Sequence, residues 1–241
     1  MNKLLWAAIL SFVLVPESSA QFVNSKLKHG KRRIQVILVL PAQVSLAKAG
    51  IKGSEGMPEE GDKLGNDLYT LVCTRLSGYG AKVLPNPLEE DLSDTARYAL
   101  AEIQRKYDTT EVQMLRNPRA VGKGRYTVGD SVASYAPAAD ADTLVYIRGS
   151  GTVLDRTEQL MGRIPGPWMW SAKGQVFDGR LVFVDARSGE VLVFVAFTTY
   201  GGWKKTAEEL MPRIQNVMLH LPVPIYNFLG PSQSNPPRRP N

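Results

Sequence analysis

The stretch GRLVFVDARSGEVLVFVAF (Gly179–Phe197) joins two runs of β-branched and aromatic residues through a short polar connection. The runs extend over 176–184 and 191–199, and both have the composition of strands that are largely buried. The connection Asp185–Glu190 is short enough for a hairpin, and Gly189 can adopt the positive φ that such turns need. The sequence therefore predicts an antiparallel hairpin.

Further strands are predicted upstream of the hairpin. Residues 34–40 (IQVILVL) form an almost continuous apolar run that ends before Pro41, as expected of a central strand. Shorter strands are predicted over 81–84 and 143–148, and the Gly-Ser-Gly sequence at 149–151 is interpreted as a turn. The Gly-rich segment between Pro41 and Glu60 is predicted to be irregular.

Apolar residues at helical spacing predict three main helices. The first stripe contains Leu64, Leu68, Leu71, Val72 and Leu76, and Gly78 and Gly80 are expected to end it. A second helix is capped by Ser93, is lined by Ala96, Leu100, Ile103 and Tyr107, and is followed by a separate short helix over 109–116. A third, after the hairpin, has capping-box spacing at Thr206 and Glu209 and a stripe that runs to Leu221.

The order of these elements predicts the fold class. Strands that alternate with helices and then form a hairpin indicate one α/β domain over 34–230. We expect a mixed, partly antiparallel sheet flanked by helices, with a C-terminal β-hairpin followed by a helix. The Pro-rich segment 231–241 is predicted to be a disordered tail.

Residues 1–20 have the three parts of a secretory signal. Lys3 supplies the positive start, an apolar run covers 4–15, and Ser18-Ser19-Ala20 has the small residues that signal peptidase needs. Because a membrane-spanning helix takes about 20 apolar residues, this run favours export over a retained anchor. We expect cleavage after Ala20 and a periplasmic or secreted mature protein; a retained anchor is the alternative. No Cys follows the signal, so it offers no site for lipidation.

The excess of basic residues lies at the two ends of the mature chain, in residues 21–33 and in the tail, which contains Arg238 and Arg239. The net charge is +6, and loss of Lys3 and Glu17 with the signal leaves it unchanged. Residues 21–33 are predicted to form a basic flexible leader that contains Lys26, Lys28, Lys31, Arg32 and Arg33 and no acid. Between Ile34 and Gly230 there are 21 bases and 22 acids, so the body is balanced.

The leader suggests one kind of partner and disfavours another. A basic arm can bind an anionic membrane surface, where each cation adds about 1 kcal/mol. A nucleic-acid partner is not expected, because an exported protein is separated from the nucleic acids of the cell. In addition, Phe22 is the only aromatic residue near the basic run 26–33. A solvated linker that binds nothing is the other interpretation.

The counts of reactive residues limit the chemistry. With two His and one Cys, the chain cannot build a zinc site from three His or four Cys. Neither a nucleophile elbow nor a nucleotide-binding glycine fingerprint occurs. Cys73 is interpreted as a half-buried helix residue. His29 lies in the basic leader, and His220 is expected to interact favourably with the carboxyl end of the last helix, so neither is expected to be catalytic. We expect no catalytic residue, no metal and no cofactor.

Three segments together resemble a family of bacterial envelope proteins. They are KRRIQVILVLP (Lys31–Pro41), ADADTLVYIRGSGTV (Ala139–Val153) and the hairpin quoted above. They are similar to the periplasmic α/β domain of curli-pore lipoproteins, penicillin-binding-protein activator lipoproteins and the amino-terminal domain of TolB. The resemblance implies a domain that binds other envelope proteins and performs no chemistry. This chain differs from many members of these families because it lacks the Cys that is lipidated in them.

Aromatic residues in two loops are the candidate partner contacts. Trp168 and Trp170 lie in a Pro/Gly-rich connection, and Tyr200 and Trp203 flank a Gly pair after the hairpin. Such residues either pack over the sheet or bind a partner, since Trp and Tyr dominate binding hot spots. The partner can be another envelope protein or a second copy of the chain.

The sequence thus supports an exported, non-enzymatic interaction module that assists the assembly or regulation of envelope machinery. The alternative is a periplasmic enzyme or small-ligand binder with its site in the loop Pro41–Gly61, at the carboxyl end of the first strand.

Overall fold

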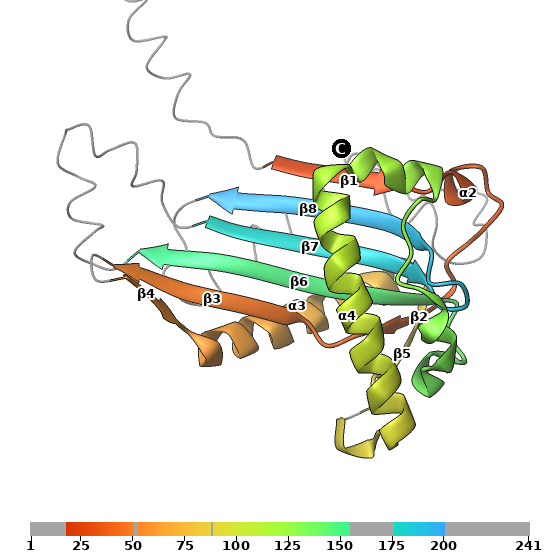
Figure 1. Cartoon of the computed structure of the whole chain (residues 1–241), viewed down its shortest axis with the longest axis horizontal. Helices are drawn as coiled ribbons and strands as arrows, with labels where there is room; N and C mark the ends of the chain where they lie inside the picture. Colours follow the sequence, from red (N-terminus) through yellow and green to blue (C-terminus); the bar gives the residue numbers. More distant parts are fainter. Residues whose placement is uncertain (1–17, 51–52, 88, 155–175, 201–241) are drawn as a thin grey trace, which may run out of the picture.

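Figure 1 shows a broad twisted sheet with a long helix on each face. The computed structural model describes residues 18–50, 53–87, 89–154 and 176–200. In chain order the strands and helices are β1 (Ser18–Val23), α2 (Ser25–Lys28), β2 (Val36–Val39), β3 (Gln43–Gly50), β4 (Gly53–Gly56), α3 (Pro58–Gly78), β5 (Lys82–Leu84), α4 (Asp94–Arg116), β6 (Thr143–Leu154), β7 (Val176–Asp185) and β8 (Val191–Tyr200). Short 3₁₀ segments are η1 (Glu89–Asp91), η2 (Pro118–Lys123), η3 (Asp130–Ser134) and η4 (Ala136–Ala138).

The eight strands form one mixed sheet. Their order is β1-β8-β7-β6-β2-β5, and β3 pairs with both β4 and β6. The pairs β1–β8, β8–β7 and β7–β6 are antiparallel, whereas β2 runs parallel to both β5 and β6. This arrangement confirms the predicted single α/β domain with a mixed, partly antiparallel sheet flanked by helices. The helix expected over 206–221 lies outside the described residues.

The β7–β8 hairpin is present as the sequence predicts. Asp185 closes its turn by accepting the backbone N–H groups of Arg187 and Ser188 on Oδ1, both at 2.8 Å. Gly189 has φ = 68°, in the left-handed region that glycine adopts without strain. The predicted positive φ at this position is confirmed.

The segment after Pro41 differs from the irregular loop that we expected. Val39 pairs with Val145 and Gln43 with Arg148, so four steps along the β2–β3 side match three along β6. Pro41 therefore lies at a bulge with one extra residue, after which the chain returns to the ladder as β3 and then turns into β4. Because a proline only removes one donor, a strand can resume beyond it on the same neighbour.

The Gly-Ser-Gly sequence at 149–151 is not a turn but the middle of β6. Gly149 pairs with Gly179 of β7, and a Cβ on Gly149 would lie 2.5 Å from the ring of Phe177. The ring of Phe197 likewise occupies the space above Gly179. The glycines are needed because neighbouring aromatic rings fill the room that their side chains would take.

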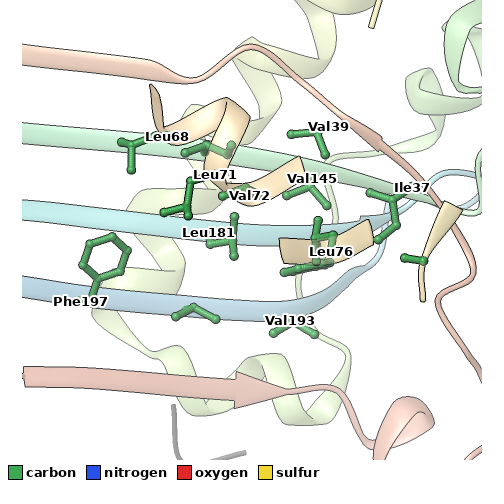
Figure 2. Packing of buried hydrophobic residues seen from close by; sticks show 14 of the residues in the cluster. Ile37, Val39, Leu68, Leu71, Val72, Leu76, Val145, Leu181, Val193 and Phe197 are labelled. Atoms are coloured by element: carbon green, nitrogen blue, oxygen red, sulfur yellow. The ribbon is translucent and has the colours of Figure 1, made fainter. Parts of the chain in front are cut away.

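Helix α3 covers one face of the sheet. All five residues of its predicted stripe, from Leu64 to Leu76, are buried. In Figure 2 the last four of them, from Leu68 to Leu76, face Ile37, Val145 and Leu181, which β2, β6 and β7 contribute to the same apolar cluster. The helix also approaches β3 closely, since a Cβ on Gly61 would lie 2.7 Å from the carbonyl oxygen of Val44.

Helix α4 covers the opposite face and is continuous. Its cluster includes Ile103 and Tyr107 with Leu144, Tyr146 and Val182 from the sheet. Residues 109–116, predicted as a separate helix, belong to α4, because Thr110 and Met114 continue the buried stripe of the first part. Ser93 caps it by accepting the N–H of Ala96 at 3.3 Å, as predicted.

Candidate functional site

The predicted aromatic contact residues are mostly beyond the described part of the structure. Trp168, Trp170 and Trp203 lie outside the described residues. Tyr200 is the last residue of β8, where its backbone pairs with that of Val176. The aromatic patch therefore stays a prediction.

Residues 21–33, expected to be a flexible leader, instead pack against one end of the sheet. Gln21 to Val23 belong to β1, and the backbone N–H of Asn24 donates to the carbonyl of Leu192 at 2.8 Å. Leu27, in α2, is 2% exposed. The leader is folded because it contains a few well-placed apolar residues among its charges, and these anchor it to the core.

Two of the five leader cations form ion pairs with the β7–β8 turn. The Lys26 ammonium is 2.5 Å from Oε2 of Glu190, whose Oε1 accepts a hydrogen bond from Asn24. The Arg32 guanidinium pairs with Asp185, a carboxylate that is 1% exposed. Lys26 and Arg32 therefore attach the leader to the hairpin, and their charges are neutralised by Glu190 and Asp185.

The other three leader cations face solvent. Lys28, Lys31 and Arg33 are exposed, and none has an acidic partner among the described residues. His29, beside them, is exposed as well. Of the five bases predicted to bind an anionic surface, these three are therefore exposed and accessible to a ligand.

A second basic segment joins them from elsewhere in the chain. Residues 118–125 contain Arg119, Lys123 and Arg125, all exposed. They lie beside the leader: a Cβ on Gly122 would be 3.6 Å from the carbonyl oxygen of Val23, and one on Gly124 would be 3.4 Å from the side-chain nitrogen of Asn24. Figure 1 shows the chain after α4 running next to α2.

We call these six exposed bases the cationic end: Lys28, Lys31, Arg33, Arg119, Lys123 and Arg125. Sequence reasoning found the first three and missed the other three. The signal was present as three bases without an acid over 118–128, but nothing in the sequence places this segment beside the leader.

A second group of charges lies between α4 and the sheet and is balanced. The Arg148 guanidinium stands 4.5 Å above the ring of Tyr107 and is held by Asp108 and by Glu111, the latter at 2.9 Å. Arg180, opposite Arg148 on β7, is 3.4 Å from the other carboxylate oxygen of Glu111. With two bases and two acids, this group holds α4 to β6 and β7 and leaves no excess charge for a ligand.

Burial sets the ionisation of the tyrosines in this region. It raises the pKa of Tyr107, and the charge of Glu111 raises it further, while Arg148 opposes the change. Burial also raises the pKa of Tyr146, whose ring stacks on Tyr107 at 4.3 Å. Both phenols therefore stay neutral at physiological pH and do not serve as bases there.

The candidate reactive groups are used structurally or lie apart. Asp142 accepts the backbone N–H groups of Gln35 and Val36 on one carboxylate oxygen, at 2.8 and 2.9 Å. Asp178 accepts a hydrogen bond from Thr198 at the other end of β7 from Asp185. Within the described ranges, no group of three or more His, Cys, Asp or Glu side chains could hold a metal ion.

The thiol and the alternative ligand site can also be placed. Cys73 is half-buried in α3, and burial raises the pKa of its thiol, against a smaller opposing effect of the hydrogen bond with Tyr69. The expected ligand loop over 41–61 is replaced by β3, β4 and the start of α3. The irregular loop that this alternative assumed is therefore largely strand and helix in the described residues.

Of the helices in the described ranges, none combines the length and apolar character needed to cross a membrane.

Comparisons with known proteins give low-level similarity. No protein-family model matches the chain, and no curated protein matches it significantly. Solved structures that match include lipoprotein GNA1162 from Neisseria meningitidis, at 13% identity and a TM-score of 0.33 over 76% of this chain and 93% of that one. Two dodecamers of PelC from Paraburkholderia phytofirmans match at 14% and 11% identity. Their TM-scores are 0.38 and 0.37, over 86% and 90% of this chain and 98% and 100% of those chains.

The solved structures named here thus include a lipoprotein, and they do not include the families whose motifs the chain resembles. The resemblance to those families stays an expectation.

Proposed function

We propose that this chain is an exported, non-enzymatic interaction module of the bacterial cell envelope. It would assist assembly or regulation of envelope machinery by binding other components, and it would act in the periplasm or outside the cell. The observation that carries the proposal is the division of charge in the described residues. Buried charges are taken up in contacts between elements, whereas six exposed bases without acidic partners gather at one end.

The chemistry of the buried groups supports a binding role over catalysis. A catalytic acid or base must be able to reach a substrate and exchange a proton with it. Asp185 and Glu111 are 1% and 8% exposed and are held by arginines, and Asp142 is occupied by two backbone donors. Their roles are to join the leader, the hairpin and α4 to the sheet.

Crosslinking in intact cells tests the proposal. A photoreactive residue placed at Lys31 or Lys123 samples the cationic end, and one at Lys63, exposed on α3, is the matched control. We expect adducts with envelope components from the first two positions and few from the third. Recovery of the chain in the cytoplasm without envelope adducts from any position would contradict the proposal.

Variants of the predicted aromatic residues provide a second test of the proposed function. Trp168→Ala and Trp170→Ala should remove a pull-down partner or change the oligomeric state, measured by sedimentation, while the circular dichroism spectrum is kept. If both variants keep every partner and the same sedimentation, these residues pack over the sheet and the partner surface lies elsewhere.

A further inference from the structure

Three chain segments that are distant in sequence converge at one end of the sheet. The leader segment 24–35 contacts the β7–β8 turn through Lys26 and Arg32. The segment 118–128 contacts the leader where Gly124 lies beside Asn24, and it also contacts the turn. Val128 N–H donates to the carbonyl of Gly189 at 2.8 Å, and Thr127 bridges to Glu190. The fold, and not the order of residues, therefore assembles this surface.

The assembled surface has a large excess of positive charge. The segments 24–35, 118–128 and 185–190 contain nine bases and two acids, a net charge of +7 in 29 residues. Two of the bases are paired, six form the cationic end, and the ninth is Arg187, which is exposed in the β7–β8 turn. Both acids, Asp185 and Glu190, are already paired. Including Asp130, Asp140 and Asp142 of the neighbouring segments still leaves +4, so most of the protein's net charge of +6 is concentrated here.

We propose that the cationic end binds the phosphate groups of an anionic lipid bilayer. The inference rests on the proposed function, because export is what brings this surface to the lipids of the envelope. A bilayer surface fits because it presents many phosphates over a wide area and needs no pocket. The six bases extend over α2, the chain after it, η2 and the residues that follow η2, and each is exposed to solvent. A broad anionic surface can neutralise charges distributed in this way.

A nucleic acid fits less well. Binding of single strands uses exposed aromatic rings on which bases stack. Phe22 and Tyr126, the aromatic residues of these segments and the adjoining β1, are half-buried, and the Tyr126 hydroxyl lies within hydrogen-bond distance of the backbone carbonyl oxygens of Gln113 and Asn117. The surface therefore offers charge without a stacking platform.

Lys26 and Arg32 are not part of the binding set, although they belong to the same basic run. Their carboxylate partners neutralise them, and Arg32 is largely turned into the domain. Attraction by a basic leader alone would depend only on the leader's bases. The inference instead predicts that the three bases from 118–125 contribute as much to the affinity for the bilayer as the three exposed bases of the leader.

Vesicle binding tests the inference with the protein purified from cells. Phosphatidylcholine vesicles with and without phosphatidylglycerol are mixed with the protein and sedimented at two salt concentrations. We expect binding only to the anionic vesicles, with loss at high salt. Each base near an anionic bilayer contributes about fivefold in affinity. The triple variants Lys28→Gln/Lys31→Gln/Arg33→Gln and Arg119→Gln/Lys123→Gln/Arg125→Gln should therefore each weaken binding roughly 100-fold.

A matched triple variant controls for net charge. Lys63→Gln/Arg97→Gln/Arg105→Gln removes the same charge from α3 and the first part of α4, away from the cationic end, and should keep nearly full binding. Equal losses in all three triple variants, no binding to anionic vesicles, or tighter binding to duplex DNA at the same salt would each overturn the inference. If vesicle binding fails but the envelope crosslinks persist, the inference is wrong and the proposed function stands. If the crosslinks are lost but vesicle binding is intact, the proposed function is wrong and the inference about lipid binding stands.

Discussion

At the scale of single residues, Arg32 and Lys31 are neighbours with opposite roles. Arg32 pairs with Asp185, which is 1% exposed, while Lys31 faces solvent. Replacing Arg32 by Gln leaves a buried carboxylate without its counter-charge. We expect Arg32→Gln to lower the free energy of unfolding by roughly 2–4 kcal/mol, and Lys31→Gln to change it by less than about 0.5 kcal/mol. Urea denaturation followed by circular dichroism measures both, and equal effects would contradict the assignment.

The buried phenols predict a loss of stability at alkaline pH. Because burial raises the pKa of Tyr107 and Tyr146, the folded protein keeps them neutral where the unfolded chain ionises them, near pH 10. Their contribution to stability is complete below that pH and is lost as pH rises above it. Denaturation measured over a series of alkaline pH values should show this decline.

The double variant Tyr107→Phe/Tyr146→Phe is the control for that decline. It keeps both rings and removes the ionisable groups, so its stability should fall less steeply with pH. At neutral pH the cost should be below about 1 kcal/mol, since no group in the described part of the chain forms a hydrogen bond with either buried hydroxyl. A variant with the same alkaline slope as the parent would show that other groups cause it.

At the scale of elements, the β7–β8 turn depends on Gly189. Its φ of 68° is one that other residues rarely adopt, and a Cβ there would collide with the backbone of Gly129. Gly189→Ala should lower the free energy of unfolding by about 2 kcal/mol or more. Gly78→Ala, in the last turn of α3 with open space around it, should be neutral or slightly stabilising. Thermal unfolding of the two variants compares them directly, and a stable Gly189→Ala protein would show that the turn tolerates rearrangement.

Elements whose pattern is local were predictable from the sequence, and those that depend on a neighbour were not. The α3 stripe and the hairpin follow from spacing alone. By contrast, Pro41 and Gly149 were interpreted as breaks because proline and glycine usually end strands. In the structure β6 supplies a continuous partner past Pro41, and the ring of Phe177 occupies the space beside Gly149. Whether such a residue ends a strand is decided by the adjoining strand, which a single segment does not reveal.

At the scale of the whole molecule, the candidate site was only half predictable. The bases of 26–33 stand out as a run, but their sorting into paired and exposed residues depends on Asp185 and Glu190, more than 150 positions away. Arg119, Lys123 and Arg125 join them through the tertiary fold. Net charge along the chain therefore locates a basic surface without giving its members.

The amino terminus of the mature protein is testable by mass. Cleavage after Ala20 should give a protein that begins at Gln21, seen by mass spectrometry of the chain purified from its native compartment. The basic surface begins beyond this point and would be kept. An intact Met1 in the exported protein would contradict the predicted signal and favour a retained anchor.

The position of this bond within β1 also bears on the order of events during export. Ala20 and Gln21 pair with Ala196 and Val195 of β8, so the bond between them lies in the middle of a strand. A protease cuts such a bond only while the strand is open. If the predicted cleavage after Ala20 takes place, it must therefore come before the sheet closes, and a chain that folds first would keep its precursor form. The rate of folding, as distinct from final stability, would then decide how much of the protein is processed.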